Sequence, residues 1–119
     1  MTQIITAIEH IVIDVSAKTD WTFIRVETSD GLTGLGEASL SGQEAAMQAN
    51  ARQLAEDLSG APLTAIERLV DDPAEGRAHR AVVSAIEQAS WDLKGKAAHK
   101  PVHALLGGAR HDTVPLYAN

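Results

Sequence analysis

Hydrophobic residues recur at helical spacing between residues 82 and 97 and mark the central element of the chain. Successive members are four, three, four and four positions apart: Val82, Ile86, Ala89, Leu93 and Ala97. This spacing places all five on one side of a helix with about 3.6 residues per turn. We therefore expect that side to face the core.

The end of this helix is marked by Pro101, which cannot continue a helix and favours extended geometry in the residues before it. The helix should therefore end near Ala98. A short helix over residues 102–106 should follow, and Gly107 and Gly108 should end it.

One aromatic residue does not fit a helix with a single buried face. Trp91 lies about 180° from Val82 and shares its side with Ser84 and Glu87. One interpretation is an interface, in which a second body covers Trp91, Ser84 and Glu87. The other is a partly exposed tryptophan that lies across neighbouring loops of its own domain. Asp92 and Lys96, at i and i+4, form a structural ion pair on the helix surface.

The first forty residues follow strand patterns. Residues 4–15 are rich in β-branched side chains, and both sides of this strand are expected to be partly buried. After a break at residues 16–20, residues 21–28 alternate between two faces, and Asp30-Gly31 supplies a tight turn. Residues 32–38 form a third strand, in which Gly34 and Gly36 predict the close approach of another element. The lengths favour a three-stranded antiparallel meander.

Helical segments follow the strands. Residues 43–58 form a helix that either Ser39 or Ser41 could cap, with Glu44 completing a capping box in the second case. Its expected core positions are Ala46, Met47, Ala51, Leu54, Ala55 and Leu58. Thr64 is the expected cap of a shorter helix over residues 65–70, and residues 71–76 form a loop. The fold class is therefore α+β: a three-stranded antiparallel meander followed by a bundle of three to four helices.

Composition restricts the class of protein further. A chain of 119 residues is one domain by length. No apolar run approaches the roughly 20 residues of a membrane span, and the first fifteen residues lack the features of a signal peptide. The absence of cysteine fits a reducing cytoplasm, where we expect the protein to be. A formal charge of −6, with scattered basic residues, argues against nucleic acid and anionic membranes as partners.

No catalytic residue and no metal ligand is predicted within the chain. Of the five histidines, only His99 and His103 stand at i and i+4, and Pro101 lies between them. The glycines near residue 34 do not form a dinucleotide fingerprint, and no GxSxG elbow surrounds the serines. Glu37 is either a solvated strand-end residue, a partner of Arg25, or a carboxylate that faces a cleft.

The order of four motifs resembles a known family. The motifs are residues 30–38 (DGLTGLGEA), residues 85–96 (AIEQASWDLKGK), Pro101, and residues 105–108 (LLGG). Together they resemble the N-terminal capping domain of the mandelate racemase and muconate lactonizing enzyme group of the enolase superfamily. The resemblance implies an α+β cap over the mouth of a (β/α) barrel. It assigns residues 1–110 to the cap, and residues 111–119 to a linker and the start of the first barrel strand.

The resemblance also implies a reaction and partners. Family members stabilise an enediolate with Mg²⁺ after a Lys or His base removes the proton next to a carboxylate, which leads to racemisation, cycloisomerisation or dehydration. The base and the metal ligands belong to the barrel, which needs roughly 250 residues. The chain itself would hold no cofactor and would not be catalytic alone. Its partners would be its own C-terminal barrel, a small carboxylate substrate, and further copies in a homo-oligomer.

Two loops would carry the capping role by this resemblance. Residues 16–21 and 38–42 would reach over the substrate, although both are short for the family. The residues assigned to these loops are Lys18, Thr19, Asp20 and Trp21 in the first, and Ser39, Leu40 and Ser41 in the second. His99 stands where a helix-ending glycine is common, and should adopt a left-handed conformation with some strain. The alternatives are a stand-alone interaction or oligomerisation module without catalysis and an independent small hydrolase.

Overall fold

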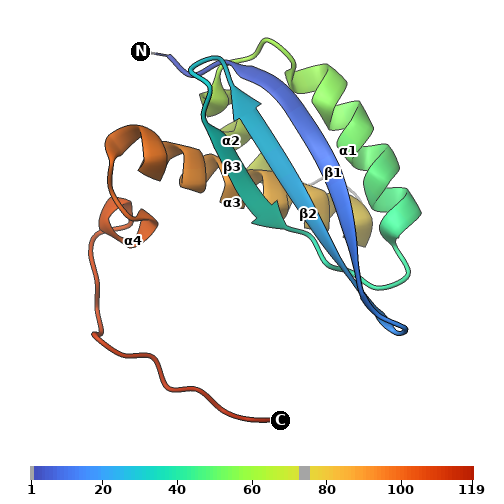
Figure 1. The fold of residues 1–119 in the computed structure, drawn as a ribbon. Coiled ribbons are helices and arrows are strands. Elements are labelled where there is room, and N and C mark those ends of the chain that lie inside the picture. Colours follow the sequence, from blue (N-terminus) through green and yellow to red (C-terminus); the bar gives the residue numbers. More distant parts are fainter. Residues whose placement is uncertain (1, 73–75) are drawn as a thin grey trace.

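The computed structural model describes residues 2–72 and 76–119, in which helices pack on one face of a three-stranded antiparallel sheet of order β1-β2-β3 (Figure 1). The strands are β1 (Ile5–Ser16), β2 (Thr19–Thr28) and β3 (Thr33–Glu37). The helices are α1 (Glu44–Leu58), a 3-10 turn (Leu63–Ala65), α2 (Ile66–Val70), α3 (Arg77–Ala98) and α4 (Val102–Leu105). The expected α+β fold class is confirmed.

Strand β2 forms the centre of the sheet and shows the expected alternation. Thr22, Ile24, Val26 and Thr28 are buried against the helices, and the residues between them lie on the opposite, outer face. The hydroxyl of Thr28 donates to the Asp30 carboxylate at 2.6 Å, so this polar side chain is satisfied in the expected turn. Gly31 in that turn has a φ of 82°.

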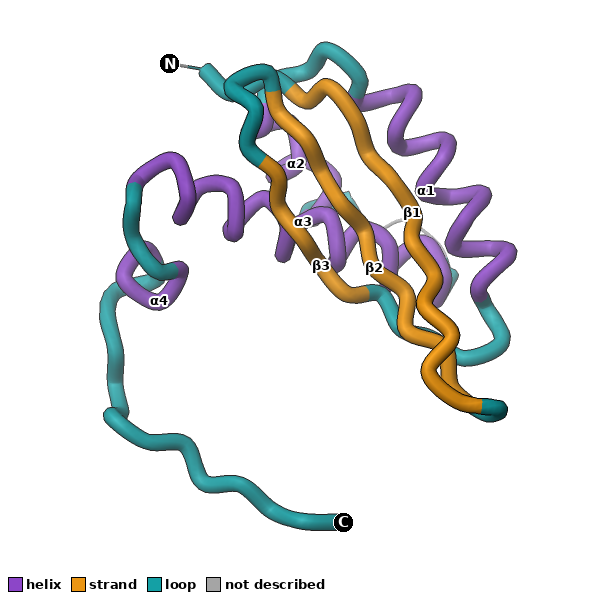
Figure 2. Tube along the Cα trace, in the orientation of Figure 1, coloured by secondary structure: helices purple, strands orange, loops and turns teal. Residues whose placement is uncertain are grey.

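Strand β1 departs from a simple alternating strand. A register shift between Ile5 and Ala7 lets both Ile5 and Ile8 pack against the core. The expected burial of both sides is wrong beyond residue 11, because Val12, Ile13 and Val15 are exposed. The tube view shows the reason: the β1–β2 hairpin extends past the helices (Figure 2). The turn of this hairpin contains only residues 17 and 18, so the expected break at residues 16–20 is shorter than predicted.

Strand β3 packs directly on α3, as its glycines predicted. A Cβ atom at Gly34 would overlap the carbonyl oxygen of Ala89, and one at Gly36 would overlap the carbonyl oxygen of Ala85. Since main-chain atoms cannot move aside as a flexible side chain can, only glycine fits at these two positions.

Helix α1 buries four of its six expected core residues, Met47, Ala51, Leu54 and Leu58, whereas Ala46 is exposed and Ala55 is half-buried. The expected caps are wrong. The N-cap position is Gln43, without a side-chain cap, and the Glu44 carboxylate accepts from the main chain of Gly42 at 3.2 Å. Thr64 lies inside the 3-10 turn and does not cap α2.

Helix α3 buries Val82, Ile86, Ala89 and Leu93 completely, as expected, but Ala97 is exposed because it lies in the last turn. The helix ends at Ala98, and His99 adopts the predicted left-handed conformation, with φ 53° and ψ 41°. The N–H of Lys100 donates to the Gly95 carbonyl at 2.9 Å, which completes the helix end. After α4, residues 109–119 extend away from the helices (Figure 1) and are assigned to no helix or strand.

Candidate functional site

The tip of the β1–β2 hairpin carries the first group of predicted capping residues. Lys18 lies in the turn, and its N–H donates to the Ser16 hydroxyl at 3.3 Å. Thr19, Asp20 and Trp21 lie on β2 instead of in a loop. Asp20 stands directly opposite Asp14 on β1, and such a like-charged pair weakens a hairpin. The apolar residues of the hairpin lie next to this pair.

Those apolar residues form a patch on the outer face of the sheet, here called the hairpin patch: Ile11, Ile13, Trp21 and Phe23. The strand register places Ile13 opposite Trp21, and Ile11 opposite Phe23. The Trp21 and Phe23 rings meet edge to face, with centroids 6.5 Å apart. Trp21 remains 46% exposed and Ile13 47% exposed, so the patch can bind another apolar surface and exclude water from it.

The second group of predicted capping residues lies in the segment that follows β3. Ser39 does not cap α1. Its hydroxyl oxygen accepts a hydrogen bond from the Thr22 N–H at 3.0 Å, and its hydroxyl donates to the Glu37 carboxylate at 2.9 Å. Leu40 packs against the core, and Ser41 is exposed. The structure thus brings Ser39 beside Thr22, the neighbour of Trp21.

A hollow of about 330 Å³ opens beside this segment, between the end of β3 and the first turns of α3. Glu37, Ser39, Leu40, Arg77, Arg80 and Ser84 are among its lining residues. Ser84, predicted to belong to an interface, therefore lies next to the capping segment. Glu37 does not pair with Arg25, because the Arg25 guanidinium lies 2.8 Å from the Glu9 carboxylate.

The predicted interface residues lie along α3 on the side of α2. Ser84 and Glu87 line a groove of about 330 Å³, together with Leu69, Val70 and Val83. Trp91 is half-buried, and the Lys94 ammonium lies 4.7 Å from its ring centroid while also contacting Glu67 at 3.3 Å. Contacts within the domain thus account for part of the burial of Trp91. The interface itself stays a prediction.

Two histidines make specific contacts. His79 Nδ1 lies 3.1 Å from the Asn50 amide oxygen and links α3 to α1. Nε2 of His10 is buried without a hydrogen-bond partner, and burial lowers the pKa of this imidazole. Within residues 2–72 and 76–119, no group of three His, Cys, Asp or Glu side chains is placed to hold a metal ion. The same residues include no helix long and apolar enough to cross a membrane.

Neither the hydrogen bonds of Ser39 nor the exposure of the hairpin patch was foreseen. The sequence signal for Ser39 was ambiguous, since a serine before a helix is also typical of a cap. The β2–β3 register, which places Glu37 opposite Phe23, is what brings the two capping segments together.

Known proteins match this fold and these motifs. The family model of the mandelate racemase / muconate lactonizing enzyme N-terminal domain matches residues 3–107. A D-galactonate dehydratase of Variovorax paradoxus (strain S110) is 32% identical over 104 residues, which cover 82% of this chain and 27% of the dehydratase. The chain therefore spans little more than a quarter of that relative's length.

Solved structures have the same fold. Muconate cycloisomerase from Pseudomonas fluorescens superposes with a TM-score of 0.80 at 27% identity, covering 94% of this chain and 34% of the cycloisomerase. A Burkholderia xenovorans strain LB400 protein assigned to the L-alanine-DL-glutamate epimerases, solved with magnesium and fumarate, gives a TM-score of 0.79 at 27% identity. That match covers 94% of this chain and 29% of the epimerase. Because the family model covers residues 3–107, the chain belongs to the mandelate racemase / muconate lactonizing enzyme N-terminal domain family.

Proposed function

We propose that this domain caps the active site of a metal-dependent enolase-superfamily enzyme, a racemase, cycloisomerase or dehydratase that acts next to a carboxylate. The observation that carries the proposal is the position of the hairpin patch. Trp21 and Ile13 are exposed on the β1–β2 hairpin, whose end extends past the helices (Figure 2). Ser39 connects β2 to the segment after β3 through the Thr22 N–H. The relatives support the reaction class, because they are named as a dehydratase, a cycloisomerase and an epimerase.

The metal and the base are assigned to a barrel domain. The described residues offer Mg²⁺ no site, since no three potential ligands lie together among them. The domain's own contribution is to cover the substrate. Trp21 and Ile13 exclude water, and Lys18, Thr19, Asp20 and Ser41 present polar groups at the edge of the covered space. Ser39 and Leu40 hold the second segment in place.

The same proposal divides the chain into a cap and a segment that leads into the barrel. Residues 1–110 form the cap, and residues 111–119 lead into the first strand of the barrel. The exposure of Val114, Leu116 and Tyr117 supports this division, because apolar side chains of this size are normally buried in a finished fold.

The proposed partners are the barrel of the same protein, a small carboxylate substrate, and further copies of the protein that contact the Trp91 side of α3. Nucleic acid and membranes are not among them, because the charge of −6 repels phosphate. A cytoplasmic location fits a chain without cysteine.

The capping role can be tested by replacing Trp21 with alanine in the enzyme that carries this domain. We expect kcat/KM to fall by on the order of 10-fold or more and the preference among hydroxy acids and dipeptides to change, because a substrate-covering contact is lost. Leu35→Ala is the matched control, since Leu35 is 48% exposed on the same outer face but lies away from the hairpin tip. If both substitutions change kcat/KM and substrate preference equally little, the hairpin patch is not part of the active site.

A stand-alone interaction module is the second candidate, and the groove beside Ser84 and Glu87 favours it. It predicts that the chain alone self-associates in sedimentation experiments and that Glu87→Arg abolishes the association. The capping proposal requires no association of the isolated chain.

A further inference from the structure

We propose that Ser39 and Gln88 are positioning residues that join the β1–β2 hairpin and the segment after β3 into one unit fixed to α3. The existence of this unit is inferred from hydrogen bonds of the described residues. Its purpose, which is to cover the substrate, rests on the proposed function.

The first connection is made by the Ser39 side chain. Its oxygen accepts from the Thr22 N–H at 3.0 Å, while the Ala38 N–H donates to the Thr22 carbonyl at 2.8 Å. Both main-chain groups of Thr22 are thus taken by the segment after β3. Thr22 is buried, so loss of the Ser39 oxygen would leave its N–H unpaired unless the segment moved or water entered.

The second connection orients the Ser39 hydroxyl. The hydroxyl donates to Glu37 Oε1 at 2.9 Å, which leaves the oxygen's lone pairs available for the Thr22 N–H. The Glu37 side chain is exposed, so the position of its carboxylate depends on how firmly the Glu37 main chain is held.

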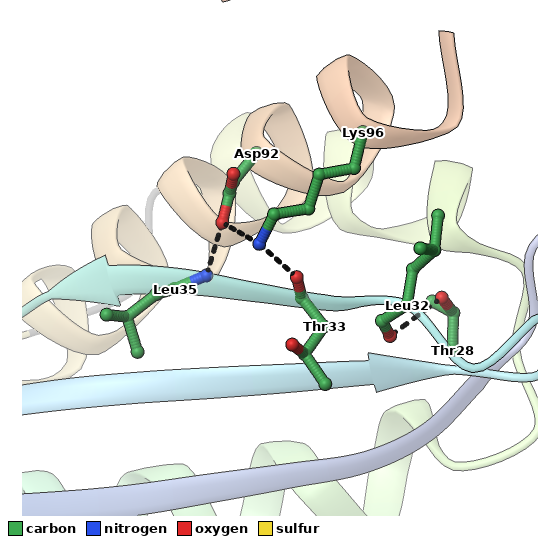
Figure 3. Close-up of polar contacts among 6 residues, drawn as sticks. All are labelled: Thr28, Leu32, Thr33, Leu35, Asp92 and Lys96. Carbon is green, nitrogen blue, oxygen red and sulfur yellow. Dashed lines mark hydrogen bonds and ion pairs between the residues drawn. The ribbon is translucent and has the colours of Figure 1, made fainter. Parts of the chain in front are cut away.

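The third connection anchors that main chain to α3. The Gln88 side chain accepts from the Glu37 N–H at 3.0 Å and donates to the Glu37 carbonyl at 3.3 Å. One amide side chain therefore pairs with both outward-facing groups of the last residue of β3, as a neighbouring strand would. One and two turns further along α3, Asp92 accepts from the Leu35 N–H and Lys96 donates to the Thr33 carbonyl (Figure 3).

Four hydrogen bonds thus run from α3 through Glu37 and Ser39 to β2. Trp21 directly precedes Thr22, the last residue in this series, so a displacement of the Thr22 main chain also displaces that of Trp21 and of Ile13, which pairs with it. A movement of the segment after β3 would therefore carry Trp21 with it. The two segments that are proposed to cover the substrate would open and close together, with Gln88 fixing their resting position.

The experiment compares Ser39→Ala with Ser41→Ala in the ¹⁵N-labelled chain of 119 residues. Ser41 is the matched control, because it lies in the same segment, is exposed and makes none of these hydrogen bonds. We expect amide hydrogen exchange at Thr22 to accelerate by on the order of 10-fold or more in Ser39→Ala and to stay unchanged in Ser41→Ala. The order parameter of the Trp21 indole N–H should fall in the first variant only. Ser39→Thr, which keeps a hydroxyl, should restore both values.

Gln88 is tested in parallel by the exchange of the Glu37 amide. Gln88→Ala should accelerate this exchange, whereas Gln53→Ala should not, because the Gln53 side chain donates to Asp57 of the same helix, α1, and not to β3. The proposal is overturned if Thr22 stays as protected in Ser39→Ala as in Ser41→Ala, or if Trp21 keeps its order parameter while Thr22 exchanges faster. No substrate takes part in these measurements, so their failure would leave the capping role untouched, and failure of the Trp21→Ala test would leave this coupling untouched.

Discussion

The Asp92 carboxylate of α3 accepts a hydrogen bond from the Leu35 N–H of β3 at 3.0 Å (Figure 3). The same carboxylate lies 2.9 Å from the Lys96 ammonium, which in turn donates to the Thr33 carbonyl at 2.6 Å. An ordinary ion pair on the helix surface would leave the strand edge open. Here the two side chains close main-chain groups that could otherwise pair with a strand of another molecule.

Replacement of Asp92 by alanine should therefore affect stability more than an exposed ion pair does. We expect the free energy of unfolding to fall by about 1–2 kcal/mol, because the Leu35 N–H loses its partner and Lys96 loses its counterion. Urea denaturation checks the value. Asp57→Ala is the control, since the Asp57 carboxylate accepts from Gln53 of its own helix instead of from a strand. Equal losses in both variants would show that the bond to β3 contributes nothing.

Gly36 should tolerate no larger residue. Gly36→Ala should destabilise the fold by about 1–3 kcal/mol or more, because the added methyl group overlaps the main chain of Ala85 and forces β3 and α3 apart. The neighbouring Leu35→Ala should change the free energy of unfolding by much less, since Leu35 is half exposed. A Gly36→Ala variant as stable as the unmodified protein would contradict the contact.

The two sides of α3 should respond differently to truncation. Ile86→Ala should cost on the order of 2–5 kcal/mol, because Ile86 is fully buried and leaves a cavity. Trp91→Ser should change the unfolding of the monomeric domain far less and should weaken association with a barrel or a second copy. Denaturant unfolding and sedimentation measure the two effects. If Trp91→Ser is as damaging to the monomer as Ile86→Ala, Trp91 belongs to the domain core and the interface prediction is wrong.

His10 should make stability depend on pH. Burial lowers the pKa of His10 below 6.5, so the unfolded chain binds a proton at this residue at pH values where the folded chain does not. The free energy of unfolding should therefore fall as the pH decreases from about 6.5 through the folded pKa. His10→Gln should flatten this dependence, and His111→Gln, at an exposed position, should not. Identical pH profiles for both variants would argue against the role of His10.

The chain alone should neither bind Mg²⁺ stoichiometrically nor exchange the α-proton of a carboxylate substrate. The proposed ligands and base belong to a barrel, and the described residues hold no cluster of potential ligands. Calorimetry with Mg²⁺ and deuterium wash-in on hydroxy acids and dipeptides measure both activities. Tight, stoichiometric metal binding would contradict the assignment of the metal to the barrel.

Local patterns were enough to predict most of the architecture. The alternation along residues 22–28 and the helical spacing from Val82 to Leu93 depend on neighbours in sequence, and both were confirmed. Gly34 and Gly36 predicted a close approach because a glycine inside a strand needs a spatial reason. The position of His99 followed in the same way from the proline after it and from the family resemblance.

The errors occurred where distant residues compete with local ones. Ser39 was one of two serines that could cap α1, but its oxygen instead accepts a hydrogen bond from the buried Thr22 N–H of β2. The register shift at Ile5 and the reach of the hairpin beyond the helices follow from how the layers fit together, which no pattern along β1 reveals. The predicted Asp92–Lys96 ion pair is confirmed. Its bonds to the main chain of β3 were not predicted, because their partners, Leu35 and Thr33, lie 57 and 63 residues away in the sequence.

The three side chains of α3 that bond the main chain of β3 also have a consequence for the order of folding. The bonds from Gln88, Asp92 and Lys96 close loops of 51, 57 and 63 residues. Loop-closure entropy grows only with the logarithm of length, so the longest loop costs merely about 0.2 kcal/mol more than the shortest. Once one bond has formed, the other two should therefore follow in the same step. During synthesis the residues of β2 and β3 therefore precede all three partners on α3, and the outer main-chain groups of β3 gain these partners only as residues 88–96 are made.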